Sequence, residues 1–152
     1  MPITIAPERP DTPDAAALVE ELDELLIPLY PIESHHGLSV ASLIAEQVAF
    51  FVLRVDGAPA GCGGVKIYPE GYAEVKRMFV RPRYRGLGLS KRMLGHLEDY
   101  TRAQGLSILR LETGVLQQAA LGLYTRMGFT EIPPFGPYRP DIHSLCFEKH
   151  LT

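Results

Sequence analysis

Residues 72–90 read YAEVKRMFVRPRYRGLGLS, a stretch in which the predicted structure changes from strand to loop to helix. The segment Tyr72 to Val80 is rich in β-branched and aromatic side chains and predicts a strand. The letters RYRGLG at residues 83–88 predict a tight basic loop, and apolar residues at helical spacing follow it up to Gly105, which is placed to end the helix. A strand, a basic glycine-containing loop and a helix are therefore expected in succession.

This loop has the composition of an anion site. Backbone N–H groups at the start of a helix lack partners within the helix, and the helix dipole is positive there. Gly86 and Gly88 would let a ligand approach these donors, while Arg83 and Arg85 add charge and fork-shaped donors suited to phosphate oxygens. The pattern favours a diphosphate, although a flexible connection with two solvated arginines remains an alternative. The loop lacks the Gly-Lys-Ser/Thr of a triphosphate site and the third glycine of a dinucleotide site.

The preceding residues predict a three-stranded antiparallel centre. Asp56-Gly57 between two apolar runs is a hairpin signal, and Pro69-Glu70-Gly71 predicts the next turn. Glycines in the middle strand suggest close backbone approach or a bulge. Towards the amino terminus we expect a strand, an amphipathic helix ended by prolines, and a short helix. These expected elements span residues 3–6, 13–28, 40–45, 48–55, 59–68 and 72–80.

After the basic loop, strands and helices alternate again. Residues 106–112 form a nearly continuous aliphatic run, which predicts a strand buried on both faces. A helix is expected over 117–127, an extended piece from 128, a proline-rich turn over 133–140 and a last strand over 143–148. The period changes too often for a repeat protein or coiled coil, so an α/β domain is predicted.

Composition limits the possible classes of protein. With 152 residues, 46% of them apolar, the chain has room for one domain with an ordinary core. The formal charge of −3 argues against a dedicated nucleic-acid binder, and no apolar run is long enough to span a membrane. Two cysteines, Cys62 and Cys146, have no metal-ligand spacing and are expected to be small core residues. We therefore expect a cytoplasmic protein without a metal, a nucleic-acid partner or a membrane.

A second motif lies at residues 120–129, which read ALGLYTRMGF. Taken alone, Tyr124 is more typical of a core residue than of a catalyst. Together, however, Arg-x-x-Gly-x-Gly opening one helix and Ala-x-x-Leu-Tyr-x-x-x-Gly-Phe about thirty residues later resemble the GNAT superfamily of acetyl-CoA-dependent N-acetyltransferases. The resemblance covers nearly the whole chain. It implies one domain over residues 1–152 with the GNAT-type acyl-CoA N-acyltransferase fold, a mixed, mostly antiparallel sheet of about six to seven strands flanked by about four helices.

The resemblance also implies where acetyl-CoA would lie. Residues that match the end of the central strand would pair with the pantetheine arm, and the loop that follows would hold the diphosphate through its main chain. Gln117 stands where many members of the superfamily have asparagine. The implied coenzyme-binding residues are Met78, Phe79, Val80, Arg83, Arg85, Gly86, Leu87, Gly88, Leu89, Ser90 and Gln117.

Two residues are implied as catalytic. Tyr124 matches the tyrosine that protonates the thiolate leaving group, and Glu74 is placed like the general base of the histone-acetylating branch, acting through a water. Strand alternation predicts that Glu74, Lys76, Met78 and Val80 share one face. Pairing of Glu74 with Lys76 or Arg77 is the alternative to a catalytic role.

For the acceptor, the candidates lie at the second strand of the predicted splay, in the segment after the first helix and in the proline-rich turn. Glu112 could act as a base or anchor a cation, with Thr113 beside it. Acceptor contacts are expected from Glu112, Thr113, His35, His36, Phe135 and Tyr138, with Arg139 as a further part of the wall.

The function expected is transfer of an acetyl group from acetyl-CoA to a primary amine of a small metabolite or amino-acid-like acceptor, by direct attack in a ternary complex. A protein or peptide amine as acceptor, a longer acyl chain and a non-catalytic acyl-CoA-binding regulatory module remain alternatives. A homodimer is also possible within the superfamily.

Overall fold

Seven strands form one sheet in the order β1-β2-β3-β4-β5-β7-β6, in a computed structural model that describes all residues 1–152. Only the β4–β5 pair is parallel. The strands are β1 (Ile3–Pro7), β2 (Ala49–Val55), β3 (Ala58–Tyr68), β4 (Tyr72–Val80), β5 (Ile108–Gly114), β6 (Thr130–Ile132) and β7 (Ser144–His150). The α-helices are α1 (Pro13–Leu26), α2 (Val40–Ala45), α3 (Leu89–Ala103) and α4 (Gln118–Arg126). The predicted mixed, mostly antiparallel sheet with four helices is confirmed.

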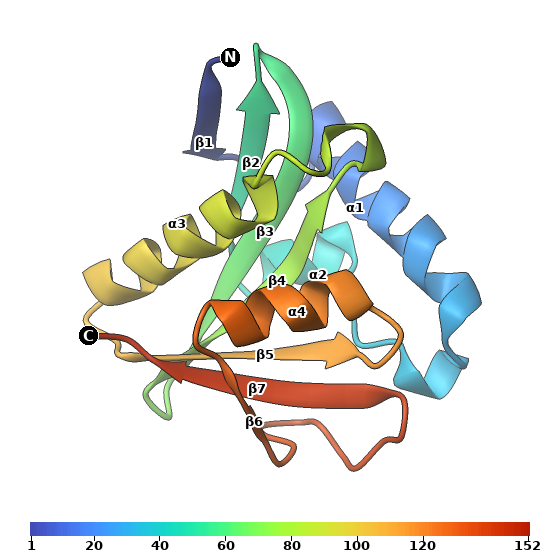
Figure 1. Ribbon diagram of the computed structural model, residues 1–152, viewed down its shortest axis with the longest axis vertical. Coiled ribbons are helices and arrows are strands. Elements are labelled where there is room, and N and C mark those ends of the chain that lie inside the picture. Colours follow the sequence, from blue (N-terminus) through green and yellow to red (C-terminus); the bar gives the residue numbers. More distant parts are fainter.

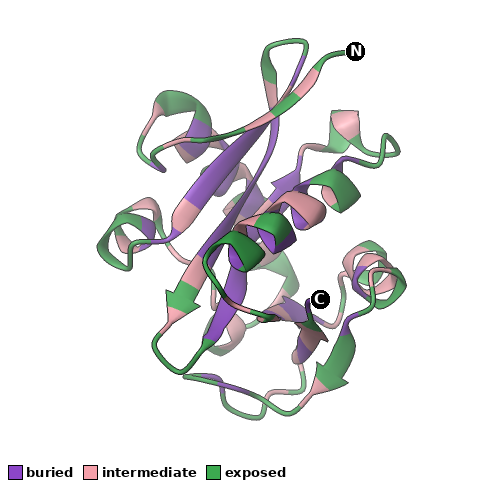
Figure 2. Ribbon diagram, turned by 90° about the vertical axis from the view of Figure 1, so that its left-hand side faces the viewer, coloured by how far each residue is buried: buried purple, intermediate pink, exposed green.

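The helices cover both faces of the sheet (Figure 1). Apolar residues of α3 and α4, among them Met93, Leu97 and Tyr124, pack with strand residues in one cluster. Leu18 of α1 and Leu43 of α2 pack with strand residues on the other face. The central strands are accordingly buried, while the outer helix surfaces are exposed (Figure 2). Both cysteines are buried and unpaired.

Most element boundaries follow local signals. Thr12 caps α1 by accepting a hydrogen bond from the Ala15 N–H, and α1 ends at Leu26, two residues before Pro28. The last two long strands begin slightly later than the sequence predicts, at Ile108 and Ser144. Boundaries of this kind are set by sheet pairing rather than by the residues at the ends.

Strands β4 and β5 pair over only a short distance. Ala73 lies opposite Leu109 and Glu74 opposite Arg110, and no further pairs follow. Both strands run on beyond this point, so they diverge and leave an opening in the middle of the sheet (Figure 1). The backbone of the second half of β4 is therefore free on the side that faces β5.

A β-bulge interrupts β4 at the point of divergence. Two β4 residues, Arg77 and Met78, lie opposite the single β3 residue Gly63, and Arg77 has a φ of 54°. A positive φ is uncommon for a residue with a side chain. Beyond the bulge, each side chain of β4 points to the face opposite the one that strict alternation predicts.

The prediction of strict alternation along β4 is therefore wrong beyond Lys76. Met78 and Val80 pack in the same cluster as Val75, whereas Glu74 and Lys76 face the opposite side. One extra residue in a strand shifts the side-chain period by one, so the expected face is split into two.

Gly61 is required where β3 passes β4. A Cβ at this position would lie 2.6 Å from the Phe79 carbonyl oxygen, which belongs to rigid backbone. Replacing Gly61 with alanine is expected to lower the free energy of unfolding by about 1–3 kcal/mol, because β3 must move away from β4. Urea denaturation measures this change.

Gly95 provides the matched control within α3. A Cβ there would meet nothing within 4 Å, so Gly95→Ala should raise stability by about 0.5–1 kcal/mol through helix propensity. Equal effects of the two substitutions would contradict the close contact between β3 and β4.

Candidate active site

The loop between β4 and α3 presents free backbone donors. Six consecutive N–H groups, from Gly86 to Lys91, donate to no group of the protein, and α3 begins without a side-chain cap. The first N–H groups of a helix have no intrahelical acceptor, and Gly86, Leu87 and Gly88 extend this row of donors backwards. The predicted anion site therefore has its donors available.

Glycine is needed in this loop for its backbone angles. Gly86 has a φ of 84° and Gly88 a φ of 73°, and a Cβ at either would meet nothing within 4 Å. The space is open, so positive φ rather than crowding selects glycine here. The conformation turns the amide groups outward and starts α3 with its positive end exposed.

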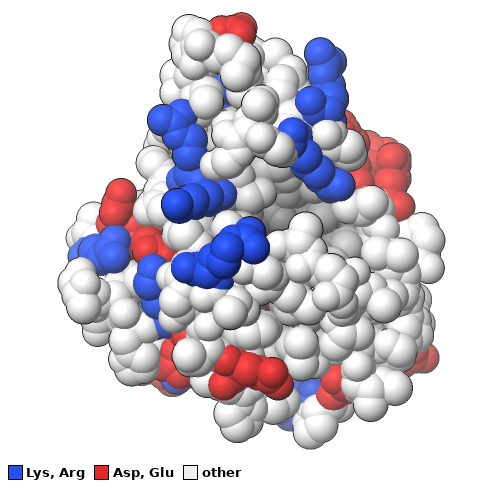
Figure 3. Space-filling model, in the orientation of Figure 1, with Lys and Arg blue, Asp and Glu red and all other residues white.

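Basic side chains surround these donors. Arg83 and Arg85 are exposed, and the Arg85 Nε donates to the Val80 carbonyl at 3.4 Å. Arg81, by contrast, pairs with Glu21 of α1 at 2.6 Å. Figure 3 shows Lys and Arg side chains on both sides of a hollow on this face. Free amides, a helix N-terminus and unpaired guanidinium groups fit the diphosphate of coenzyme A.

A cavity of about 280 Å³ lies at the opening between β4 and β5. Side chains of α1, β4, β5 and α4 line it together with the segment 30–37 and Tyr138. The structure brings nine residues singled out in the sequence to this one cavity: His35, His36, Glu74, Met78, Glu112, Thr113, Gln117, Tyr124 and Tyr138.

Other expected residues lie elsewhere. Phe79 packs beneath α1, and Leu89 is buried in the core, so neither side chain lines the cavity. Phe135 does not line the cavity, because it packs behind Tyr138 with 5.2 Å between the ring centroids. Arg139 is exposed and also lies outside the cavity.

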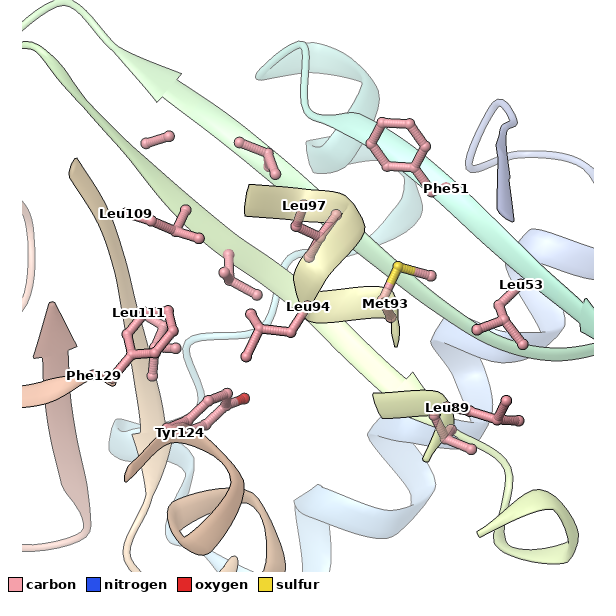
Figure 4. Packing of buried hydrophobic residues seen from close by; sticks show 14 of the residues in the cluster. Phe51, Leu53, Leu89, Met93, Leu94, Leu97, Leu109, Leu111, Tyr124 and Phe129 are labelled. Carbon is pink, nitrogen blue, oxygen red and sulfur yellow. The ribbon is translucent and has the colours of Figure 1, made fainter. Parts of the chain in front are cut away.

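Tyr124 presents an unpartnered hydroxyl. The residue is 6% exposed, and its ring packs edge-on against Phe129 at 5.8 Å (Figure 4). Its hydroxyl makes no hydrogen bond with the protein, although the residue lines the cavity. Burial and the Glu112 carboxylate raise the pKa of Tyr124 above its usual range, so the phenol stays protonated at neutral pH.

Glu74 is fully engaged by its neighbours. It is 1% exposed; one carboxylate oxygen accepts from the Tyr68 hydroxyl at 2.7 Å, and the other accepts from the Tyr138 hydroxyl. The Lys76 Nζ lies 3.1 Å from the same second oxygen and donates to the Tyr138 hydroxyl at 3.0 Å. The pairing with Lys76, which the sequence left as an alternative to a catalytic role, is therefore present.

The Glu112 carboxylate has fewer side-chain partners than that of Glu74. It accepts a hydrogen bond from the Ser144 hydroxyl at 2.7 Å and has no Lys or Arg within ion-pair distance. Burial raises the pKa of Glu112 above its usual value, while the bond from Ser144 opposes the shift. A carboxylate of this kind can accept a proton near neutral pH more readily than an exposed glutamate.

Segment 30–37 closes one side of the cavity. The Ser34 hydroxyl donates to Asp141 at 2.6 Å, His35 Nε2 bonds to the Tyr30 carbonyl at 2.8 Å, and the Tyr30 hydroxyl accepts from the Leu116 N–H at 3.1 Å. Sequence reasoning missed Tyr30, Ser34 and Asp141. No local pattern could reveal them, since Ser34 and Asp141 are 107 positions apart.

Gln117 contributes to the end of β5 rather than projecting freely. Its side-chain oxygen accepts from the Gly114 N–H at 2.9 Å. This bond orients the side chain at the start of α4, where it lines the cavity beside Thr113.

Two splayed parallel strands, a helix start with free N–H donors and a protonated tyrosine at the opening are the arrangement expected of an acyl-CoA-dependent acyltransferase. The sequence model of the Acetyltransferase (GNAT) family matches residues 17–129, and the chain belongs to this family. Enzymes of the family use acetyl-CoA as the acyl donor, and this chain is an acyltransferase of the same kind.

Individual relatives agree with this assignment. The chain is 48% identical to an IAA acetyltransferase of Azospirillum brasilense over 150 residues, which is 98% of each chain. A solved structure of a provisionally assigned acyl-CoA N-acyltransferase from Klebsiella pneumoniae matches with a TM-score of 0.84 and 33% identity, over 99% of this chain and 98% of that one.

The PaiA N-acetyltransferase of Thermoplasma acidophilum, solved in complex with coenzyme A, shares the fold at a TM-score of 0.73 and 18% identity, over 99% of each chain. At this identity the likeness concerns the fold alone. No helix of this chain combines the length and the apolar character that crossing a membrane requires.

Proposed function

We propose that this protein transfers the acetyl group of acetyl-CoA to the primary amine of a small acceptor bound in the cavity, with both substrates present at once. One observation carries the proposal: the unpartnered hydroxyl of Tyr124 and the carboxylate of Glu112 line the same cavity at the opening between β4 and β5. A proton donor and a proton acceptor are what amine acetylation requires.

The main chain would hold and polarise the donor. The free N–H groups from Gly86 to Lys91 bind the diphosphate, and acetyl-CoA supplies an activated thioester. The Arg81 N–H donates to the Ala60 carbonyl of β3, so the N–H of Val80, one residue earlier, faces the opening. A backbone donor there stabilises negative charge that develops on the carbonyl oxygen.

The side chains would move the protons. As the amine nitrogen bonds to the acetyl carbon and the carbon–sulfur bond breaks, Glu112 accepts a proton from the nitrogen and Tyr124 donates one to the sulfur. We assign the proton acceptor to Glu112 rather than to Glu74, because three donors already occupy the oxygens of the Glu74 carboxylate. Glu74 instead fixes Lys76 and Tyr138 in the wall of the cavity.

Replacing Glu112 with glutamine is expected to lower kcat/KM for the amine by roughly 100-fold. Since the active form of the base is ionised and burial raises its pKa, wild-type kcat/KM should fall with decreasing pH earlier than for an ordinary glutamate, and the substitution should remove that limb. A pH profile unchanged in shape would exclude Glu112 as the base.

The pH dependence of the free energy of unfolding gives an independent test of the raised pKa of Glu112. A carboxyl with a raised pKa in the folded state contributes stability that is present at low pH and lost as pH rises through that pKa. Glu112→Gln should therefore be more stable than wild type near neutral pH, with the difference disappearing at about pH 4.

The test of the proposed function is release of free thiol from acetyl-CoA in the presence of amines, amino acids and peptides, with the acetylated product identified by mass spectrometry. Acetylation of small amines is the expected result. Coenzyme A binding without release of thiol for any acceptor would instead favour the non-catalytic binding module.

A further inference from the structure

Arg77 is a buried cation at the bulge in β4 that the proposed chemistry does not use. Its side chain is 4% exposed, yet the residue lines the cavity beside Glu74 and Met78. Burial of a charge is costly unless partners surround it. Donor atoms of the guanidinium that lack a protein acceptor therefore indicate which ligand groups the cavity can bind.

Protein groups satisfy only part of the Arg77 guanidinium. Nη2 donates to the Val19 carbonyl at 3.1 Å and to Asp23 at 2.5 Å, which ties β4 to α1. Nε is buried and has no acceptor. Nη1 makes no hydrogen bond either, and it is not among the fully enclosed polar atoms. Because Nε is fully enclosed, Nη1 is the unfilled donor that a bound ligand can reach.

The backbone leaves space for this side chain. A Cβ at Gly37 would lie 1.8 Å from Nη1 of Arg77, so only glycine permits the observed position. Arg77 itself adopts a φ of 54°, a conformation that costs free energy in a residue with a side chain. A structural role in joining β4 to α1 explains the hydrogen bonds of Nη2. It does not explain why Nε and Nη1 have no acceptor.

The charged side chains of the cavity differ in whether their polar atoms have partners in the protein. Both basic residues have an acidic partner, since Lys76 Nζ lies 3.1 Å from the Glu74 carboxylate and Arg77 Nη2 lies 2.5 Å from Asp23. Glu112 has no cationic partner, and Arg77 has donors without acceptors. The cavity therefore offers one place for a positive group and one for a negative group of the same ligand. Its volume of about 280 Å³ suits a small molecule.

We propose that the acceptor is a zwitterionic amino acid, whose carboxylate is bound by Arg77 while its amine lies towards Glu112. This inference rests on the proposed function, since it names the class of amine that the same cavity accepts. Charge-assisted hydrogen bonds between guanidinium and carboxylate are strong and directional, so they position the amine as well as bind it.

The wild-type enzyme provides the first test, which needs no variant. Each amino acid of a panel, including α-, β- and γ-amino acids, is compared with its carboxamide and with the amine that lacks the carboxyl group. For the best acceptor, kcat/KM is expected to be roughly tenfold or more higher for the amino acid, because the carboxamide offers Arg77 only a neutral acceptor and the amine without the carboxyl group offers none. Equal or better turnover of the uncharged analogues would overturn the inference.

Substitutions test whether Arg77 causes the preference for the amino acid over its carboxamide. Arg77→Gln should bring the ratio of kcat/KM between amino acid and carboxamide close to one, and Gly37→Ala should lower it by displacing the guanidinium. Arg81→Gln is the matched control, because Arg81 directly follows β4 and is also paired with α1, through Glu21, but lies outside the cavity. The control should keep the wild-type ratio. If the ratio survives in Arg77→Gln, or is lost equally in Arg81→Gln, Arg77 is not the carboxylate site.

The two proposals fail in distinguishable ways. Release of thiol with simple amines but no preference for a carboxylate overturns this inference and leaves the proposed function intact. No release with any acceptor, despite coenzyme A binding, overturns the proposed function itself.

Discussion

Replacing Gly86 with glutamate is expected to weaken coenzyme A binding by roughly 100-fold or more. The substitution places a carboxylate among the free N–H groups that would hold the diphosphate, and it forces a side chain into a backbone with a φ of 84°. Like charges at short distance repel, and a displaced loop cannot present its donors in a row. Isothermal titration calorimetry measures the affinity directly.

Gly105→Glu is the matched control for this substitution. Gly105 follows the other end of α3, about 22 Å along the helix, has a φ of 79° and leaves a Cβ in open space. Gly105→Glu therefore introduces the same backbone strain and the same charge, but far from the free N–H groups of residues 86–91. Similar losses of affinity in both variants would point to a change in global structure instead.

Replacing Tyr124 with phenylalanine is expected to lower kcat by roughly 100-fold or more, with little change in the dissociation constant of coenzyme A. The substitution removes only the hydroxyl, and that hydroxyl makes no hydrogen bond with the protein. Packing against Phe129 and Phe147 is retained, so the free energy of unfolding should stay within about 0.5 kcal/mol of wild type.

Tyr100→Phe serves as the control for loss of a hydroxyl. Tyr100 lies on α3 and packs edge-on against Phe51 at 5.4 Å, outside the cavity. It should leave kcat unchanged. A parallel fall of kcat and coenzyme A affinity in Tyr124→Phe would assign that residue a structural role, and normal kcat would exclude it as the acid.

The order of strands and helices could be predicted because its signals are local. Asp56-Gly57, with φ values of 50° and 83°, forms the predicted hairpin, and Gly88 with its positive φ starts α3. The residues that line the cavity could be named because motif spacing places them at strand and helix ends. Their contacts could not be predicted, because the hydrogen bonds of Glu74 with Tyr138 and of Ser34 with Asp141 join distant segments.

The glycines of β3 indicated a possible bulge, but the sequence did not predict that the extra residue would lie in β4, at Arg77. Period-2 reasoning assumes an uninterrupted ladder, and the extra residue arises from the pairing of β4 with β3 across Gly63. The bulge separates the face that carries Glu74 from the face that carries Val80, and it turns Arg77 toward α1. The position of Arg77 in the cavity wall depends on that irregularity.

Diphosphate binding at the start of α3 is tested most directly by an NMR titration of the ¹⁵N-labelled protein with coenzyme A, which reports on each backbone amide separately. Hydrogen bonding to phosphate oxygens should move the amide proton resonances of residues 86–91 downfield, while those at the far end of α3 stay in place. Saturable binding that leaves these six amides unshifted would show that the diphosphate is held elsewhere.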